Sequence, residues 1–164
     1  MDQLGWDQRR CLVTDGGREY QGREIVRSPR PSFVVRLVWE ASGEATVVVY
    51  GEVDQYTASC LRDVIETTVA AGATSVIIDL TEVTFLDAAG LGVAAIAARA
   101  LGAERTAIVC HARLARVFGL TALDRVLTIC RSREEACERL GRPLPATAAR
   151  VPQAFFAREE RLPA

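Results

Sequence analysis

The stretch TFLDAAGLG, residues 84–92, places an acidic residue between an apolar segment and a run of small residues. Asp87 suits the N-cap of a helix, because its carboxylate can accept the backbone N–H of Ala89 or Gly90, which is worth about 1 kcal/mol. Glycine near a helix start costs about 1 kcal/mol relative to alanine, so Gly90 and Gly92 need a reason. Either an external group approaches the backbone closely or the helix packs tightly on its own sheet. Both explanations predict a flat surface of small side chains at a helix start.

The side chains that catalysis needs are sparse. His111 is the only histidine, and it follows Cys110 at a predicted strand end, where neighbouring side chains point to opposite faces. We interpret His111 as a surface residue rather than as a catalytic base. GLG at 90–92 lacks the third glycine of a dinucleotide fingerprint, and the chain has no lysine for a phosphate-binding P-loop. We therefore expect no enzymatic activity, no cofactor and no metal site.

The five cysteines are Cys11, Cys60, Cys110, Cys130 and Cys137. An odd count without a CxxC pair argues against a disulfide framework and against a thiolate zinc site. We interpret the cysteines as buried, reduced thiols, and a redox-sensing pair is the alternative.

The elements that must position Asp87 alternate along the chain in the order β-β-α-β-α-β-α-β-α. The predicted strands cover 33–40, 45–50, 76–80, 105–110 and 126–131. The predicted helices cover 57–72, 87–101, 112–120 and 132–141. Strands and helices that alternate with short links predict an α/β sandwich with a small, mostly parallel mixed sheet and helices packed against it.

Local signals support these boundaries. Leu61, Val64 and Ile65 recur at helical spacing, and Gly72 suits the C-cap of that helix. Ser132, with a glutamate three residues later, predicts a capping box.

Tails flank this regular region. Residues 1–32 are polar and arginine-rich and end in the breakers SPRPS, so we predict a mostly flexible N-terminal arm, of which the part around Tyr20 or Ile25 could lie on the domain. Residues 33–140 form the predicted domain, and 141–164, which begin GRPLP, form a predicted C-terminal tail. Residues 154–162, AFFAREERL, could form a short amphipathic helix, but a disordered end is the preferred interpretation.

The overall charge is nearly balanced, with a formal net charge of −1. Such a surface gives no broad attraction to nucleic acid or to a membrane, and we expect neither nucleic-acid binding nor membrane insertion. The first residues, MDQLGWDQRR, lack the apolar segment of a signal peptide, so we expect a cytoplasmic protein.

Two segments resemble the STAS domain of bacterial anti-sigma factor antagonists: GEVD at 51–54, and VIIDLTEVTFLDAAGLGV at 76–93. The resemblance extends over 33–140 and implies a small β/α sandwich, in agreement with the predicted element order. The family pattern at the helix start is Asp-Ser-Ser/Thr-Gly. The resemblance implies that the second hydroxyl residue accepts phosphate from a GHKL-type anti-sigma factor kinase. The unphosphorylated antagonist binds that kinase and frees a sigma factor.

Alanine replaces both hydroxyl residues here, and Ala89 occupies the phosphoacceptor position. A phosphate at this position would add about −1.5 to −2 charges beside Asp87 and break a contact by repulsion. The resemblance therefore implies an antagonist that cannot be switched off at the usual site. The partner-binding surface that it implies is Glu52, Asp54, Thr84, Asp87, Ala88, Ala89 and Gly90.

Other interpretations stay open from the sequence. The acids Glu52 and Asp54 could face basic residues of a partner, or be solvated loop acids with Asp54 as a turn former. The chain could be a STAS subunit of a lipid-transport ABC complex or of a stress-signalling scaffold, or a binder of a small molecule or nucleotide, and a homodimer is left open. Control could use other groups near the same edge or the arginine-rich arm. These groups are Thr57, Ser59, Cys60, Thr81 and Thr84.

Overall fold

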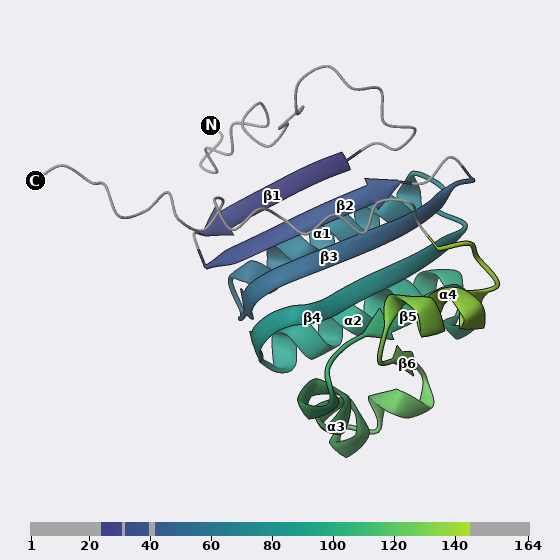
Figure 1. Ribbon diagram of the computed structural model, residues 1–164. Coiled ribbons are helices and arrows are strands. Elements are labelled where there is room, and N and C mark those ends of the chain that lie inside the picture. Colours follow the sequence, from purple (N-terminus) through teal and green to yellow (C-terminus); the bar gives the residue numbers. More distant parts are fainter. Residues whose placement is uncertain (1–23, 31, 40–41, 145–164) are drawn as a thin grey trace, which may run out of the picture.

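A mixed sheet of six strands forms the framework of the computed structural model, which describes residues 24–30, 32–39 and 42–144 (Figure 1). The strand order in the sheet is β1-β2-β3-β4-β5-β6. β1, β2 and β3 pair antiparallel, whereas β3, β4, β5 and β6 pair parallel. The strands are β1 Glu24–Arg30, β2 Phe33–Trp39, β3 Glu44–Val53, β4 Ser75–Leu86, β5 Thr106–Val109 and β6 Thr128–Cys130.

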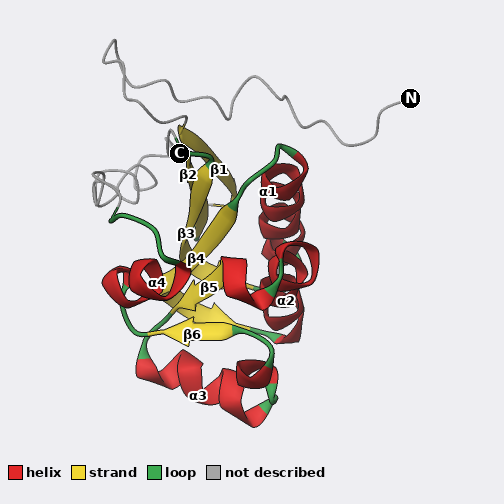
Figure 2. Cartoon of the chain, turned by 90° about the vertical axis from the view of Figure 1, so that its right-hand side faces the viewer, coloured by secondary structure: helices red, strands yellow, loops and turns green. Residues whose placement is uncertain are grey.

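Helices cover both faces of this sheet unequally. α1 and α2 lie side by side on one face, α4 lies on the other, and α3 lies at the β6 end (Figure 2). The helices are α1 Thr57–Ala70, α2 Ala88–Leu101, α3 Ala112–Leu120 and α4 Arg133–Leu140, with short 3₁₀ turns η1 Ala103–Arg105 and η2 Leu123–Arg125. The predicted α/β sandwich with a mostly parallel mixed sheet is confirmed.

The packing explains why these segments form these elements. On α1, the positions that recur at helical spacing are buried against the sheet, among them Leu61 and Ile65. On β3, Val47 and Val49 join the same core while Val48 points to the other face, as the period of a strand requires. A second, smaller core lies between α4 and the sheet, around Ile77 and Val109.

The first correction concerns the predicted N-terminal arm. Residues 24–30 form β1, an edge strand paired with β2, so the sheet begins before residue 33. The sequence pattern did not predict this strand because it contains Pro29. A proline cannot donate to the hydrogen-bond ladder and so argues against a central strand. At an edge it is tolerated, and here it falls where the register shifts between Arg27 and Arg30. Residues 1–23 lie outside the described residues.

The second correction concerns the start of the predicted C-terminal tail. Gly141 ends α4 in a left-handed conformation, and Arg142 is buried. Its guanidinium donates to the Ala45 carbonyl and to Thr46 Oγ1. The domain therefore extends past residue 140, because a long side chain reaches back to β3. Residues 145–164, including the helix considered for 154–162, lie outside the described residues.

The third difference is the length of β4, which continues to Leu86 rather than ending at residue 80. Two register shifts against β3 mark this extension. β5 pairs only with Val76–Asp79 of β4, so among the described strands the later part of β4 has a partner on one side only. The prediction of a short central strand followed an apolar run, and the polar residues of the extension, such as Thr81 and Glu82, end that run.

None of the described helices combines the length and the apolar character needed to cross a bilayer.

Candidate functional site

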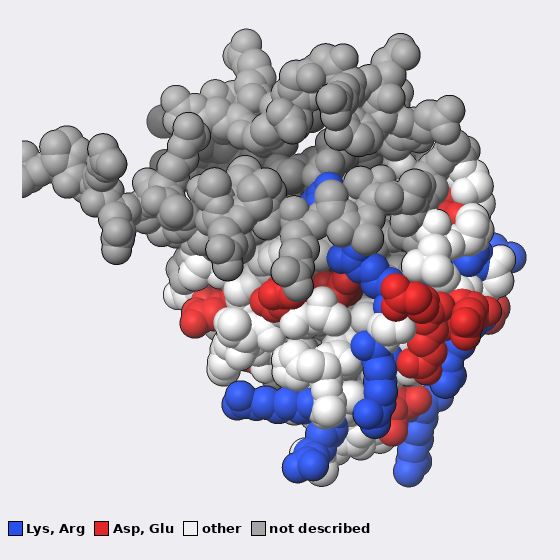
Figure 3. Space-filling view, in the orientation of Figure 1, with Lys and Arg blue, Asp and Glu red and all other residues white. Residues whose placement is uncertain are grey.

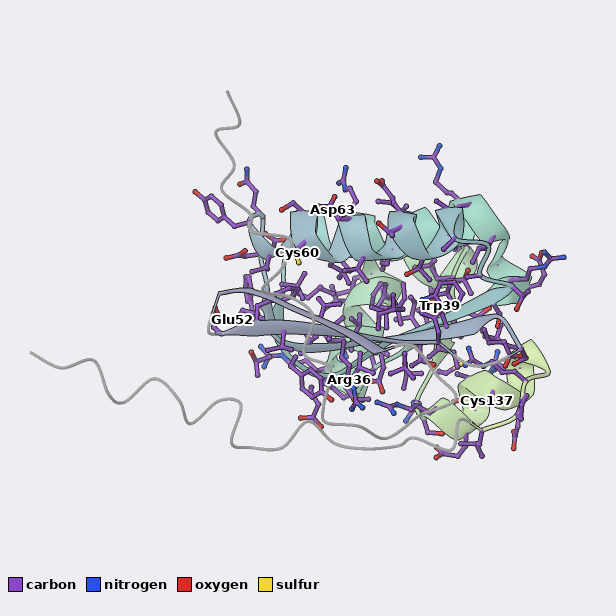
Figure 4. The ribbon with its side chains drawn as sticks, turned by 90° about the horizontal axis from the view of Figure 1, so that it is seen from above. Arg36, Trp39, Glu52, Cys60, Asp63 and Cys137 are labelled. Carbon is purple, nitrogen blue, oxygen red and sulfur yellow. The ribbon has the colours of Figure 1, made fainter. Side chains whose placement is uncertain are left out.

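The candidate site lies at the carboxyl ends of β3 and β4, where two loops meet the starts of α1 and α2. Open α/β sheets gather their binding loops at such an edge. Glu52 marks this end of β3, at the left of Figure 4. A hydrogen bond of 3.1 Å from the Asp87 N–H to the Val53 carbonyl joins the two loops. The predicted site residues from both loops are therefore brought to one edge.

Gly51 allows Ser32, just before β2, to approach the end of β3 closely. Its φ of +85° lies in the left-handed region that favours glycine, and a Cβ there would come within 1.8 Å of the Ser32 carbonyl oxygen. The next residue, Glu52, donates its N–H to that same oxygen at 3.1 Å. The loop before β2 and the end of β3 are thus in backbone contact, which fixes the direction in which β3 leaves the sheet.

The start of α2 has the cap that the sequence predicts. Oδ1 of Asp87 accepts the N–H groups of Ala89 at 2.8 Å and Gly90 at 3.0 Å. These bonds satisfy backbone donors that the first helical turn leaves without partners. The Asp87 carboxylate is therefore a structural group as well as a negative charge at the edge.

The two glycines of α2 have different causes. A Cβ on Gly90 would lie 2.5 Å from Leu86 Cδ1 and 2.8 Å from Val53 Cγ1, so Gly90 lets the helix pack closely on the strand ends. A Cβ on Gly92 would meet nothing within 4 Å, and Gly92 is exposed. The tight-packing explanation therefore holds for Gly90, whereas Gly92 leaves bare backbone open to solvent.

We call the surface formed by Ala88, Ala89 and Gly92 the small-residue surface. Ala88 is exposed, and Ala89 is partly buried against the core of the domain. Gly90, which the resemblance also assigned to the contact, is buried beneath it. Nothing in this surface is charged or can donate a side-chain hydrogen bond. It suits an approach by a group that contacts methyl carbons and backbone.

The loop before α1 is built differently. Oδ1 of Asp54 accepts the N–H groups of Tyr56 at 2.9 Å and Thr57 at 2.8 Å. The buried Thr57 hydroxyl accepts the Asp54 N–H at 2.8 Å and donates to the Glu52 carbonyl at 2.9 Å. Asp54 is therefore a turn former, as its second interpretation held. Glu52 keeps an exposed side chain and is the acid of this loop that is better placed to meet a partner.

Two exposed aromatic residues at this edge of the sheet escaped the sequence interpretation. Tyr56 is 69% exposed in the α1 loop, and Phe85 is 51% exposed at the end of β4. The register shift in which Gly51 pairs with Val83 but Glu52 with Phe85 adds a residue to β4. This bulge turns both Thr84 and Phe85 outward, which strict alternation would not predict. An exposed aromatic residue beside a bare helix start is typical of a contact surface.

A hollow of about 530 Å³ continues this surface along the open edge of β4 toward α3. Arg113 and Val117 of α3 line one side, and Glu82, Thr84 and Phe85 of β4 line the other. Glu82, Arg113 and His111 supply the charged or titratable groups of the hollow, and the other lining side chains supply hydroxyls and apolar carbons. The hollow is open to solvent at its rim.

His111 lies where the start of α3 meets the extension of β4 and lines part of the hollow. It is exposed and caps α3, with its Nδ1 accepting the Leu114 N–H at 3.4 Å. This bond leaves the proton on Nε2, which lies 3.3 Å from the Val83 carbonyl. His111 thus ties α3 to the extension of β4. These contacts give it a structural role at a helix start rather than at a strand end.

Exposed charged side chains lie on α3 and α4. Arg113 and Arg116 are exposed on α3, and basic side chains project around that end of the molecule in Figure 3. Glu134 and Glu138 are exposed on α4, where acidic side chains gather. The small-residue surface belongs to neither group. Contact there would depend on shape and apolar burial more than on charge.

The structure separates the hydroxyl groups that were considered for control. Thr57 is buried within the α1 cap, and the Thr81 hydroxyl donates to the buried Asp79 carboxylate at 2.6 Å. Asp79 also forms an ion pair with Arg133. Ser59 is exposed and donates to the Tyr56 carbonyl, and Thr84 is exposed on the rim of the hollow. Ser59, Thr81 and Thr84 are therefore the exposed hydroxyl residues of this set, and Asp79 holds the hydroxyl of Thr81.

The described cysteines are free thiols. Cys110, Cys130 and Cys137 are buried, and Cys60 is partly buried, whereas Cys11 lies outside the described residues. Burial raises the pKa of the Cys110 and Cys130 thiols to about 11, so both are protonated at neutral pH and react slowly. In the described part of the chain, no three His, Cys, Asp or Glu residues gather as metal ligands would.

Comparison with known proteins places these features in a family. A family model described as the STAS domain matches residues 38–136. The anti-sigma-B factor antagonist of Listeria monocytogenes is 34% identical over 86 residues, which covers 51% of this chain and 75% of that relative. The protein of the same name from Listeria innocua matches to the same extent.

Solved structures agree. The crystal structure of an anti-sigma factor antagonist from Mycobacterium paratuberculosis has a TM-score of 0.62 and 28% identity, and covers 70% of this chain and 99% of that one. A putative anti-sigma factor antagonist from Thermotoga maritima has a TM-score of 0.51 and 21% identity, with 59% and 88% covered, and supports the fold alone. The family model, which spans more than half of the chain, and these relatives show that the chain belongs to the STAS domain family.

Proposed function

We propose that this chain is a regulatory binding protein without enzymatic activity, an anti-sigma factor antagonist. Its partner in this proposal is an anti-sigma factor of the GHKL kinase type. Binding to that partner frees a sigma factor. The names of the Listeria and Mycobacterium relatives support the class of partner.

One observation carries the proposal for the contact surface. The start of α2 presents exposed Ala88 and a Gly92 with open space around its backbone, and the exposed Phe85 lies at the end of the preceding strand. Apolar groups of this kind are costly to leave in water unless a partner covers them. Glu52 and Thr84 supply the polar rim, Asp87 and Asp54 hold the two loops in place, and Gly90 sets the packing beneath.

The side chain at position 89 decides how such a complex could be controlled. Ala89 follows the Asp87 cap by two residues, and its N–H is bound to that carboxylate. A phosphoryl group here would place two negative groups side by side within an apolar contact, which repels and must be desolvated. A methyl group cannot accept phosphate. The complex would therefore persist when the kinase has ATP.

The first experiment measures binding of the full chain to kinase-type anti-sigma factors from the same genome, with and without ATP. We expect one of them to bind with the same affinity in both conditions. The absence of binding to all of them would overturn the proposed partner, and a complex that dissociates only with ATP would overturn the proposed lock.

The second experiment uses Ala89→Ser, with Ala88→Ser as the matched control on the neighbouring position. With the cognate kinase and ATP, Ala89→Ser should incorporate phosphate at residue 89 and lose affinity, whereas Ala88→Ser should remain unlabelled and bound. Labelling of both variants, or of neither, would contradict the assignment of position 89.

A further inference from the structure

One side of α3 faces away from the sheet and combines basic with aliphatic residues. The residues of this side recur at helical spacing and are Arg113, Arg116, Val117 and Leu120. We call these four residues the outer α3 face. The opposite side of the helix is buried in the core of the domain. Because α3 lies at the edge of the domain beyond β6 (Figure 2), this face is open to another molecule.

The two arginines of the outer α3 face hold no ion-pair partner in the described part of the chain. Arg133, Arg139 and Arg142 each form an ion pair with a carboxylate. Arg113 and Arg116 are exposed, and no described carboxylate forms an ion pair with either of them. An arginine without a partner of its own is available to a carboxylate of another molecule, and arginine is enriched at the centre of protein contacts.

Apolar groups lie directly beside these cations. Leu120 is the most exposed large apolar side chain of the described residues, with an exposed fraction of 82%. Val117 lines the hollow of about 530 Å³ together with Arg113, and the exposed Phe85 lines it from the β4 side. Single exposed apolar residues are ordinary, but a group of them around a concave space is typical of a contact surface.

We propose that the outer α3 face, together with the adjoining hollow, binds a short acidic segment of a partner protein. Carboxylates of this segment pair with Arg113 and Arg116, and its apolar side chains cover Leu120 and enter the hollow. From Arg113 to Leu120 the helix rises about 10 Å, at 1.5 Å per residue. About four residues of an extended segment span the same distance. This second binding surface does not depend on the partner proposed for the small-residue surface.

The chemistry of this face favours a protein segment over a lipid bilayer or a nucleic acid. α3 has nine residues and its main apolar side is buried, so it offers no broad apolar face to a bilayer. Arg113 and Arg116, with Glu82 on the facing wall of the hollow, carry too little positive charge for a row of phosphates. Glu82 also favours one orientation, in which the carboxylates of the segment face α3 rather than β4.

The first test is a nuclear magnetic resonance titration of the full chain with a short synthetic peptide of alternating glutamate and leucine. The backbone amides of α3 and of the hollow should shift in a saturable way, and the affinity should fall as the salt concentration rises. The matched peptide of alternating lysine and leucine should leave α3 unchanged. Equal shifts with both peptides, or no shift on α3 with the acidic peptide, would overturn the proposal.

Charge reversal provides the second test. Arg113→Glu/Arg116→Glu should weaken binding of the acidic peptide about tenfold or more and should bind the lysine peptide instead. The control Arg62→Glu/Arg99→Glu reverses two exposed arginines of α1 and α2 and should bind like the parent. Leu120→Ser should weaken binding at low and at high salt alike. If the two double variants bind the acidic peptide equally well, the arginines of α3 do not form the site.

The third test compares the other classes of ligand. Vesicles that contain phosphatidylglycerol and a DNA duplex should each shift the amides of α3 far less than the acidic peptide does. If either shifts them as strongly, the face is not specific for a protein segment and the proposal fails. None of these outcomes decides the proposed function, which is tested separately by substitutions of Ala88 and Ala89 on α2.

Discussion

The starts of α1 and α2 lie at the same edge of the sheet and follow neighbouring strands, yet they use their residues in opposite ways. At α1, Asp54 and Thr57 bind one another and the surrounding backbone, and Thr57 is buried. At α2, only Asp87 binds backbone groups, and the next positions carry methyl groups or no side chain at all.

This difference separates an anchor from the proposed contact surface. The polar groups of Asp54 and Thr57 are satisfied internally, so these two side chains are rigid and have little left to offer a partner. A capped helix start without reactive side chains is equally well held but leaves apolar surface and backbone for another molecule. Substitutions of Asp54 and Thr57 should therefore act on stability, and exposed ones at the start of α2 should act on binding.

The largest effect is expected for Thr57→Val, which keeps the shape of the side chain. It removes the donor to the Glu52 carbonyl and the acceptor of the Asp54 N–H, which should lower the free energy of unfolding by roughly 2–3 kcal/mol. Denaturant unfolding measures this loss. The control Thr84→Val, on the exposed rim, should change stability by less than about 0.5 kcal/mol. Equal stability of the two variants would remove the distinction between the loops.

Gly90→Ala and Gly92→Ala form a matched pair two residues apart on α2. The new methyl at position 90 would press on Leu86 and Val53 and should cost about 1–3 kcal/mol of stability. The methyl at position 92 meets open space and should raise stability by up to about 1 kcal/mol. Thermal unfolding of both variants is the measurement. If Gly92→Ala also weakens partner binding, the bare backbone is part of the contact.

Asp87→Ala should cost about 1 kcal/mol, because two N–H groups lose their acceptor. Asp87→Asn is the control, since asparagine caps a helix about as well but carries no charge. Chemical denaturation should therefore rank Asp87→Asn close to the parent. A loss in Asp87→Asn as large as in Asp87→Ala would mean that the charge, not the cap, stabilises α2.

The smallest effect on stability is expected at the start of α4. The hydrogen bond of Glu135 there is exposed, in contrast to the buried Thr57 at the start of α1. Accepting the Arg131 N–H lowers the pKa of the Glu135 carboxyl below its ordinary value. A carboxyl whose pKa is lowered by folding stabilises the folded state at pH values above its ordinary pKa. This contribution is lost as the pH falls through the lowered pKa. Side-chain titration by nuclear magnetic resonance should show it. Protection of the Arg131 amide should fall over the same pH range and be independent of pH in Glu135→Gln.

Sequence patterns predicted much of this architecture because the helices and central strands are strongly periodic. The α1 face and the Asp87 and Ser132 caps follow from local rules, and the structure confirms each one. Glu135 departs from the capping-box expectation in one detail, since its carboxylate accepts the N–H of Arg131 rather than that of Ser132.

What the sequence did not reveal depends on pairing between distant segments. Residues 24–30 look like an arm rich in breakers because β1 forms only by pairing with β2. Arg142 looks like a tail residue because its contacts are with Ala45 and Thr46, far away in the sequence. The outward turn of Phe85 depends on a register shift against β3, which no pattern within β4 encodes. Exposed Phe85 was therefore the least predictable part of the candidate contact surface.

The unequal lengths of β4 and β5 have a consequence for solubility. The extension of β4 presents peptide groups sideways, where a strand from another molecule could add by backbone pairing. The link between His111 and the Val83 carbonyl holds α3 against this opening. We therefore expect that conditions which detach α3, well before they melt the central strands, will make the protein prone to aggregate into β-rich assemblies.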